Sequence, residues 1–220
     1  MKLNLIAVAL LVSAWPGASF AMPPEQPEQL IHAGPRVDAE ASLRRMLQGR
    51  ESRRQVAATL GLANEAELAV LRVGRGMQMD YLDASALGKG RGVGSSTLHT
   101  DTWRFVLWVG DTPVGLATAE RTADGSYDVV DVGARQLATR IESTLALHPV
   151  GTSSRLLRSQ EAMMDVITLD YPAPVGLRYA TLMPVPVTAI ATSDSKASPS
   201  LLADGELAAM LRTVTASRSN

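Results

Sequence analysis

The spacing of hydrophobic and polar residues is helical over residues 38–73. Apolar positions recur there every three or four residues, and turn signals interrupt them. A first helix is predicted to begin at Asp38. A second is predicted at the capping box of Ser52, and a third at the capping box of Asn64. We expect the third helix to continue to Gly74. This region therefore predicts two or three short helices.

The spacing then shortens to two, which is typical of strands. Residues 77–82 alternate between apolar and polar side chains. Residues 103–109 are rich in aromatic and β-branched residues, and residues 114–121 and 127–132 follow after turn signals. These segments predict an antiparallel meander.

The second half of the chain mixes the two periods. Residues 134–147 place apolar side chains on one helical face. Residues 154–169 fit either a helix or a strand, and we favour a strand. Residues 177–183 fit a returning strand that prolines limit to an edge. A closing helix is predicted over residues 201–214, with an interruption at Gly205.

This order of elements predicts an α+β fold. We expect short N-terminal helices, an antiparallel β-meander of about four to six strands with one long helix packed on one face, and a C-terminal helix. The regular alternation of a parallel nucleotide-binding sheet is absent from the pattern. We expect a single α+β domain over residues 38–216, after an extended proline-rich tail over residues 22–37.

The first 21 residues have the pattern of a secretory signal peptide. A short positively charged start precedes an apolar run from Leu5 to Ala14, and the small residues Ser19 and Ala21 follow. The apolar run is about half the ~20 residues that span a membrane. We therefore expect cleavage after Ala21 and a periplasmic or secreted protein without a membrane span in the mature chain.

Composition excludes several classes of site. The chain has no cysteine, which rules out disulfides, zinc–cysteine sites, iron–sulfur clusters and thiol nucleophiles. Its formal net charge is −1, which argues against nucleic acid as a partner. No motif indicates a cofactor.

A glycine-rich segment lies between two predicted strands. Gly88, Gly90, Gly92 and Gly94 alternate with other residues that include Lys89 and Arg91. Glycine backbones can bind phosphate, but neither the P-loop spacing nor G-x-G-x-x-G is present. We interpret residues 88–100 as a long mobile connector or flap, with Lys89 and Arg91 as partner-binding candidates.

The next residues include the three side-chain types of a serine hydrolase. Ser95, Ser96, His99 and Asp101 lie within seven residues. No G-x-S-x-G motif accompanies them, so they are weak catalytic candidates.

The same segment offers two metal-ligand types. On a strand, His99 and Asp101 would share a face, and a third ligand would have to come from His32 or Asp80. Nothing marks such a ligand, so we predict no metal site. The aspartates are expected in turns and on solvated faces; they are Asp80, Asp83, Asp128 and Asp131.

Two tryptophans on one predicted strand suggest a binding surface. Trp103 and Trp108 lie five residues apart, so they face opposite sides of the sheet. We expect one in the core and the other exposed, and both are candidates for partner binding. The alternative is a sheet that helices cover on both faces.

Together these features favour a binding protein over an enzyme. We expect an accessory module, chaperone-like or inhibitor-like, that binds an unknown protein or small molecule in the envelope or extracellular space. Its sheet face and residues 88–101 would make the contact. The alternative is a small cell-envelope hydrolase that uses a serine and His99.

Overall fold

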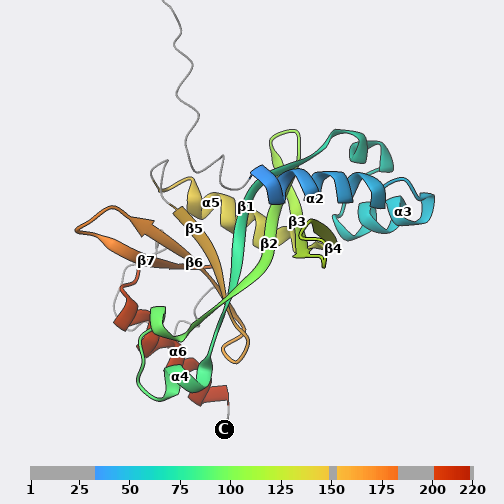
Figure 1. Cartoon of the computed structure of the whole chain (residues 1–220). Coiled ribbons are helices and arrows are strands. Elements are labelled where there is room, and N and C mark those ends of the chain that lie inside the picture. Colours follow the sequence, from blue (N-terminus) through green and yellow to red (C-terminus); the bar gives the residue numbers. More distant parts are fainter. Residues whose placement is uncertain (1–32, 149–152, 183–200, 219–220) are drawn as a thin grey trace, which may run out of the picture.

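The computed structural model describes residues 33–148, 153–182 and 201–218, which form one seven-stranded sheet with helices on both faces (Figure 1). The strand order is β4-β3-β2-β1-β5-β6-β7. The α+β class is confirmed. Seven strands replace the four to six that the sequence predicted, and helices cover two faces instead of one.

The sheet consists of two antiparallel units. The first is the predicted meander, with β1 (Leu71–Leu82), β2 (Thr97–Val109), β3 (Thr112–Arg121) and β4 (Tyr127–Gly133). The second contains β5 (Ser153–Ser159), β6 (Met164–Tyr171) and β7 (Gly176–Thr181). A parallel pairing of β1 with β5 joins them, so the sheet is mixed. Parallel neighbours need a crossover, which α5 (Arg135–Leu145) provides.

The N-terminal helices differ in detail from the prediction. Helix α2 (Ala33–Met46) begins before Asp38, so residues 33–37 are helical and not extended. Helix α3 (Arg50–Thr59) begins before Ser52, with Gly49 as its N-cap. The Asn64 capping box is confirmed at the 3₁₀ helix η1 (Glu65–Val70). The prediction that this helix reaches Gly74 is wrong, because β1 begins at Leu71.

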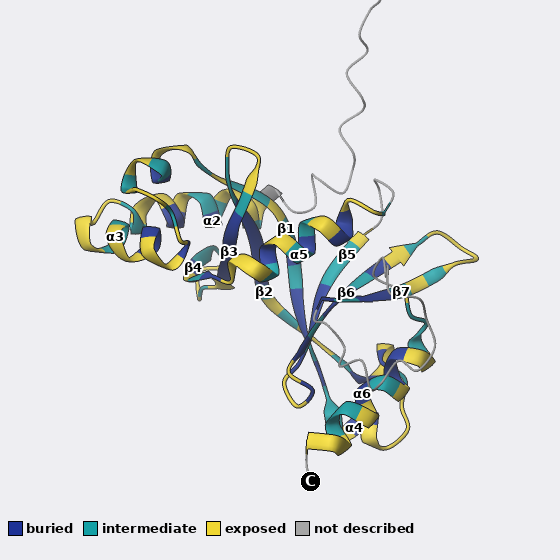
Figure 2. Cartoon of the chain, turned by 180° about the vertical axis from the view of Figure 1, so that it is seen from behind, coloured by how far each residue is buried: buried dark blue, intermediate teal, exposed yellow. Residues whose placement is uncertain are grey.

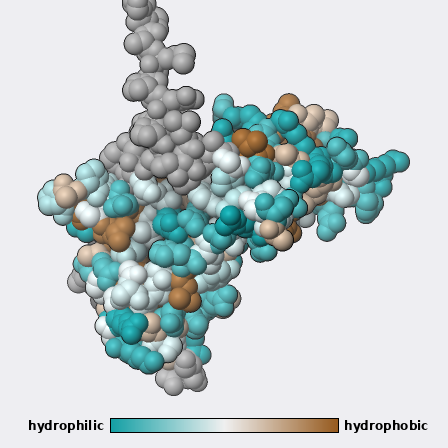
Figure 3. All heavy atoms as spheres, in the orientation of Figure 1, coloured by the Kyte–Doolittle hydropathy of each residue, from teal (hydrophilic) through white to brown (hydrophobic). Residues whose placement is uncertain are grey.

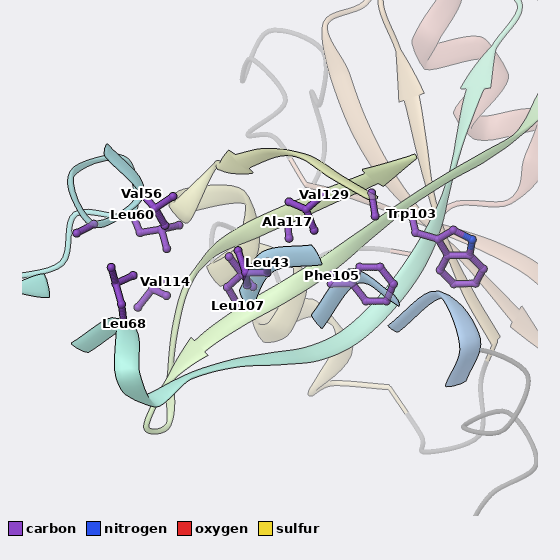
Figure 4. Packing of buried hydrophobic residues seen from close by; sticks show 13 residues of the cluster. Leu43, Val56, Leu60, Leu68, Trp103, Phe105, Leu107, Val114, Ala117 and Val129 are labelled. Carbon is purple, nitrogen blue, oxygen red and sulfur yellow. The ribbon is translucent and has the colours of Figure 1, made fainter. Parts of the chain in front are cut away.

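One face of the meander packs against α2 and α3. Trp103, Phe105 and Leu107 alternate along β2 and point into this first cluster, where Leu43 of α2 and Leu60 meet them (Figure 4). All five side chains are buried. Full burial of each large apolar side chain contributes roughly 1.5–3 kcal/mol, so this cluster anchors the helices to the sheet.

Helix α5 covers the opposite face (Figure 2). Ala138 and Ile141 of α5 are fully buried against a second cluster that includes Met77 and Val106. The helix predicted over residues 134–147 is therefore confirmed within two residues at each end.

The C-terminal region adds a third cluster. A turn at residues 160–163 divides the segment predicted as one strand into β5 and β6. Helix α6 (Asp204–Arg218) runs through Gly205 without interruption and packs near the short helix α4 (Ala84–Gly88). Leu157, Tyr179 and Leu207 are buried together there.

Both outer strands of the sheet are partly capped. On β4, the N–H of Val129 donates to Ser42 Oγ of α2 at 3.0 Å, and Arg45 pairs with Asp128 at 2.6 Å. On β7, Tyr179 exchanges two backbone hydrogen bonds with Leu202. Such caps disfavour the addition of a strand from another chain.

Candidate functional site

A bulge in β2 shapes the most polar part of the sheet. Met79 of β1 is opposite Thr102, yet the next residue, Asp80, is opposite His99. Thr100 and Asp101 are therefore extra residues in β2, and the Thr100 hydroxyl donates to the carbonyl of Met79. Bulges often redirect side chains beside functional sites. Here the bulge places His99 over Asp80 and lets Asp101 leave the ladder.

Asp80 is the buried centre of this region. Its side chain is 3% exposed and accepts two hydrogen bonds from Arg155 of β5, from Nε at 2.6 Å and from Nη2 at 2.8 Å. The sequence predicted a solvated aspartate here, and that prediction is wrong. A buried carboxylate requires a charged, hydrogen-bonded partner, and Arg155 supplies it from 75 residues away in the chain.

His99 completes the group from the surface. Its Nδ1 atom lies 3.2 Å from Asp80 Oδ1 and 3.1 Å from Arg155 Nη2. Nδ1 can accept from Arg155 when it lacks a proton, or donate to Asp80 when it carries one. The ring is 68% exposed, so a partner can reach it.

A shallow hollow lies between the bulge of β2 and the β3–β4 turn. Asp101 pairs with Arg121 of β3 at 3.5 Å, and both side chains are more than half exposed. The hollow has a volume of about 490 Å³, and its walls are Asp101, Thr102, Glu120, Arg121, Thr122, Ala123 and Gly125. It is open and polar, a shape that suits a polar group of a partner better than a buried apolar ligand.

The adjoining β3–β4 turn is held by hydrogen bonds to Asp124. The hydroxyls of Thr122 and Ser126 donate to its carboxylate. These hydrogen bonds lower the pKa of Asp124 to about 2. The turn thus forms a stable rim for the hollow at neutral pH.

The serines that the sequence singled out have other surroundings. Ser95 Oγ donates to the carbonyl of Gly92 at 3.1 Å. Ser96 Oγ is buried and has no hydrogen-bond partner among the described residues. No hydrogen bond in the described part of the chain joins either serine to His99, whose partners are given above.

The two candidate metal ligands, His99 and Asp101, contact different partners. Asp101 pairs with Arg121, whereas His99 contacts Asp80 together with the cationic Arg155. A guanidinium in this position repels a metal ion. Within residues 33–148, 153–182 and 201–218, no three His, Asp or Glu side chains could hold a metal. His32 lies outside the described residues.

The glycine-rich connector is shorter and better anchored than predicted. Helix α4 ends at Gly88, and the 3₁₀ helix η2 (Gly94–Ser96) leads into β2. Asp204 of α6 accepts the backbone N–H groups of Val93 at 3.2 Å and of Gly94 at 2.9 Å. Val93 itself is fully buried. The predicted length of the connector is therefore wrong, because η2 and β2 occupy its C-terminal half, which α6 anchors; mobility of residues 88–93 stays a prediction.

The four predicted partner-binding side chains differ in exposure: the two cations are exposed and the two tryptophans are buried or half-buried. Lys89 and Arg91 are exposed and stay predictions. Trp103 is 6% exposed in the first cluster, so it cannot contact a partner in the folded state. Trp108 is half-buried against the second cluster. The opposite orientations of the two tryptophans are confirmed, and helices cover both faces there.

In comparisons with protein families, curated proteins and solved structures, nothing matched this chain. None of the helices in the described ranges is long and apolar enough to cross a membrane.

Proposed function

We propose that this protein is an exported binding module that recognises a polar partner through the bulge of β2. We call this the bulge surface and define it by His99, Asp101, Glu120, Arg121 and Arg155. The observation behind the proposal is an exposed histidine held by the buried Asp80 and the partly exposed Arg155, beside an open polar hollow.

The bulge surface has the rigidity that recognition requires. His99, Asp101 and Arg121 belong to strands of the sheet, and Arg155 is hydrogen-bonded to Asp80. Side chains that are fixed before binding lose less conformational entropy when a partner arrives. Their exposure leaves their remaining hydrogen-bonding groups free for that partner.

The chemistry of the partner follows from the walls of the surface. Asp101, Glu120 and Arg121 present both signs of charge. On the face drawn in Figure 3, exposed hydrophobic residues are scattered and form no continuous patch. Recognition by complementary charges and hydrogen bonds therefore fits better than apolar docking, and the caps on β4 and β7 disfavour strand addition.

The hydrolase alternative lacks a serine that is hydrogen-bonded to His99 among the described residues. His99 is oriented by a carboxylate, as a general base would be, but neither Ser95 nor Ser96 is hydrogen-bonded to it. We therefore prefer binding to acyl-transfer chemistry.

Export is part of the proposal and rests on the pattern of residues 1–21, which lie outside the described residues. Expression of the full chain with a C-terminal tag in a bacterial host is expected to give a processed product that begins at Met22. N-terminal sequencing of the exported fraction measures this. Recovery of only the unprocessed chain in the cytoplasm would contradict export.

The partner is sought with residues 22–220 as bait against envelope and culture-fluid fractions of the source organism. We expect one stoichiometric partner, whose dissociation constant rises at least tenfold in the double variant Asp101→Ala/Arg121→Ala. Isothermal titration calorimetry with the purified partner measures the loss.

Two controls make this result interpretable. Arg44→Ala removes an arginine that is 76% exposed on α2, and it should leave binding unchanged. Lys89→Ala/Arg91→Ala tests the glycine-rich segment without deleting the buried Val93. If only Lys89→Ala/Arg91→Ala abolishes binding of the partner, recognition lies on the glycine-rich segment and not on the bulge surface.

A further inference from the structure

Arg104 is buried on the face of the sheet that α5 covers, and two of its guanidinium nitrogens have no hydrogen-bond partner among the described residues. Arg104 alternates with Trp103 and Phe105 along β2, so it points to the opposite face from them. Its exposure is 9%. Its Nε and Nη1 atoms are buried, and within the described residues nothing accepts a hydrogen bond from them. A buried guanidinium with unbonded N–H groups is strongly unfavourable unless an acceptor is bound there.

A second arginine lies near Arg104. Arg158 of β5 donates two hydrogen bonds to Asp165 of β6, from Nε to Oδ1 at 2.7 Å and from Nη2 to Oδ2 at 2.9 Å. Burial lowers the pKa of Arg104, and the positive charge of Arg158 lowers it further. Asp165 is therefore already bound to one cation while a second cation lies close by.

The remaining groups around Arg104 do not supply the missing acceptor. Tyr81 and Asp131 raise the pKa of Arg104, as Asp165 does, and only in part offset the lowering by burial and by Arg158. Neither Tyr81 nor Asp131 forms a hydrogen bond to Arg104 among the described contacts, and Asp131 is exposed on the outer strand β4. Two guanidinium groups thus face a single directly bonded carboxylate.

We propose that Arg104 and Arg158 bind an oxyanion, that is, a phosphate or carboxylate group of a small ligand. An oxyanion supplies acceptors for the unbonded N–H groups of Arg104 and a negative charge between two cations. Planar guanidinium groups are well suited to these anions because they donate several hydrogen bonds in fixed directions. The proposal does not depend on the bulge surface, since Asp80 and Arg155 lie on the other face of the sheet.

The test compares the thermal stability of residues 22–220 in inorganic phosphate, in acetate and in chloride at equal ionic strength and pH. For an oxyanion tenfold above its Kd, mass action predicts a rise in Tm of roughly 3–6 °C over chloride. Arg104→Met should abolish this rise, and Arg44→Met should keep it. A rise with phosphate alone, with acetate alone or with both supports the site and identifies the oxyanion.

A second measurement covers the case in which Arg104→Met does not fold. In ¹H–¹⁵N spectra of the unaltered protein, phosphate or acetate should shift an arginine Nε–H signal that is missing from Arg104→Lys. An equal rise in Tm in the unaltered protein and Arg104→Met would overturn the proposal. So would no rise together with an unshifted Nε–H signal, and water would then be the partner of Arg104.

Discussion

Two Asp–Arg pairs lie on opposite faces of the same part of the sheet, and they differ in what surrounds them. Asp80 and Arg155 face the side of α2, where His99 adds a neutral or cationic ring. Asp165 and Arg158 face the side of α5, where Arg104 adds a permanent cation. The first pair is balanced and meets solvent through His99. The second has a surplus positive charge that is buried.

This comparison shows that the group next to an ion pair decides its net charge and its access to solvent. Asp80 is 3% exposed and depends on Arg155 for its charge balance, whereas Asp165 is 13% exposed and retains some access to water. We therefore expect Arg155 to be needed mainly for stability. We expect the region around Arg158 to be able to accept an additional anion.

The largest effect is expected from Arg155→Ala. Removal of this arginine leaves the carboxylate of Asp80 buried without a counter-charge, which costs about 3–5 kcal/mol of the free energy of unfolding. Urea denaturation at pH 7 measures it. The matched variant Arg158→Ala should cost less, because Asp165 is more exposed and because the repulsion of Arg104 disappears. The reverse order of the two variants would refute the comparison.

The second effect has the opposite sign. In chloride buffer, Arg104→Met should stabilise the fold by about 1–3 kcal/mol, because an apolar side chain of similar length replaces an unbonded buried cation. Chemical denaturation without phosphate or acetate gives the value. A destabilisation above about 2 kcal/mol would mean that Arg104 makes favourable contacts in the unliganded fold.

A pH-dependent effect is expected from Glu142 on α5, on the same face as Arg104. Burial raises the pKa of Glu142, and Arg75 opposes this only in part. A carboxyl whose pKa is raised by folding holds its proton more tightly in the folded state, so its stabilising contribution is present at low pH and lost as pH rises.

Glu142→Gln should therefore raise Tm at pH 7 relative to the unaltered protein. The difference should shrink towards pH 4, below which the carboxyl is protonated in the unfolded state as well. Thermal melts across this range measure it. A difference that is independent of pH would assign the effect to packing.

The smallest effect on stability is expected from His99→Gln. The ring is 68% exposed, and exposed ion pairs contribute about 0–1 kcal/mol. Unfolding should change little, while affinity for the partner of the bulge surface should fall. Loss of stability comparable to that of Arg155→Ala would show that His99 is structural.

Local patterns were sufficient to predict the meander, the α5 helix and the Asn64 capping box. They depend on neighbours within a few residues, such as the alternation of Trp103, Phe105 and Leu107. The Ser52 capping box failed because α3 begins at Arg50 with Gly49 as its N-cap. The length of the connector after α4 was overestimated because Asp204, more than 100 residues away, accepts hydrogen bonds from Val93 and Gly94 next to η2.

The candidate sites were less predictable than the fold. The sequence singled out His99 and Asp101, which both contribute to the bulge surface. It joined them to Ser95 and Ser96, named Asp80 only as a possible third metal ligand, and missed Arg155. A charged residue at an alternating position between Met79 and Tyr81 was the available signal for Asp80. No local pattern reveals which arginine binds it.

The sequence by itself determined the class of the fold, the alternating faces of its strands and the lack of every cysteine-dependent site. Those properties follow from composition and from periods of two and 3.6 residues. Only the tertiary structure decided that β5 pairs with β1 in parallel, with Gln78 opposite Arg155. That pairing brings Arg155 to Asp80 on one face of the sheet, whereas the Arg158–Asp165 pair on the other face comes from the β5–β6 hairpin. The physical reason for the parallel pairing is the path of α5 across the sheet, which brings together residues that no short-range pattern connects.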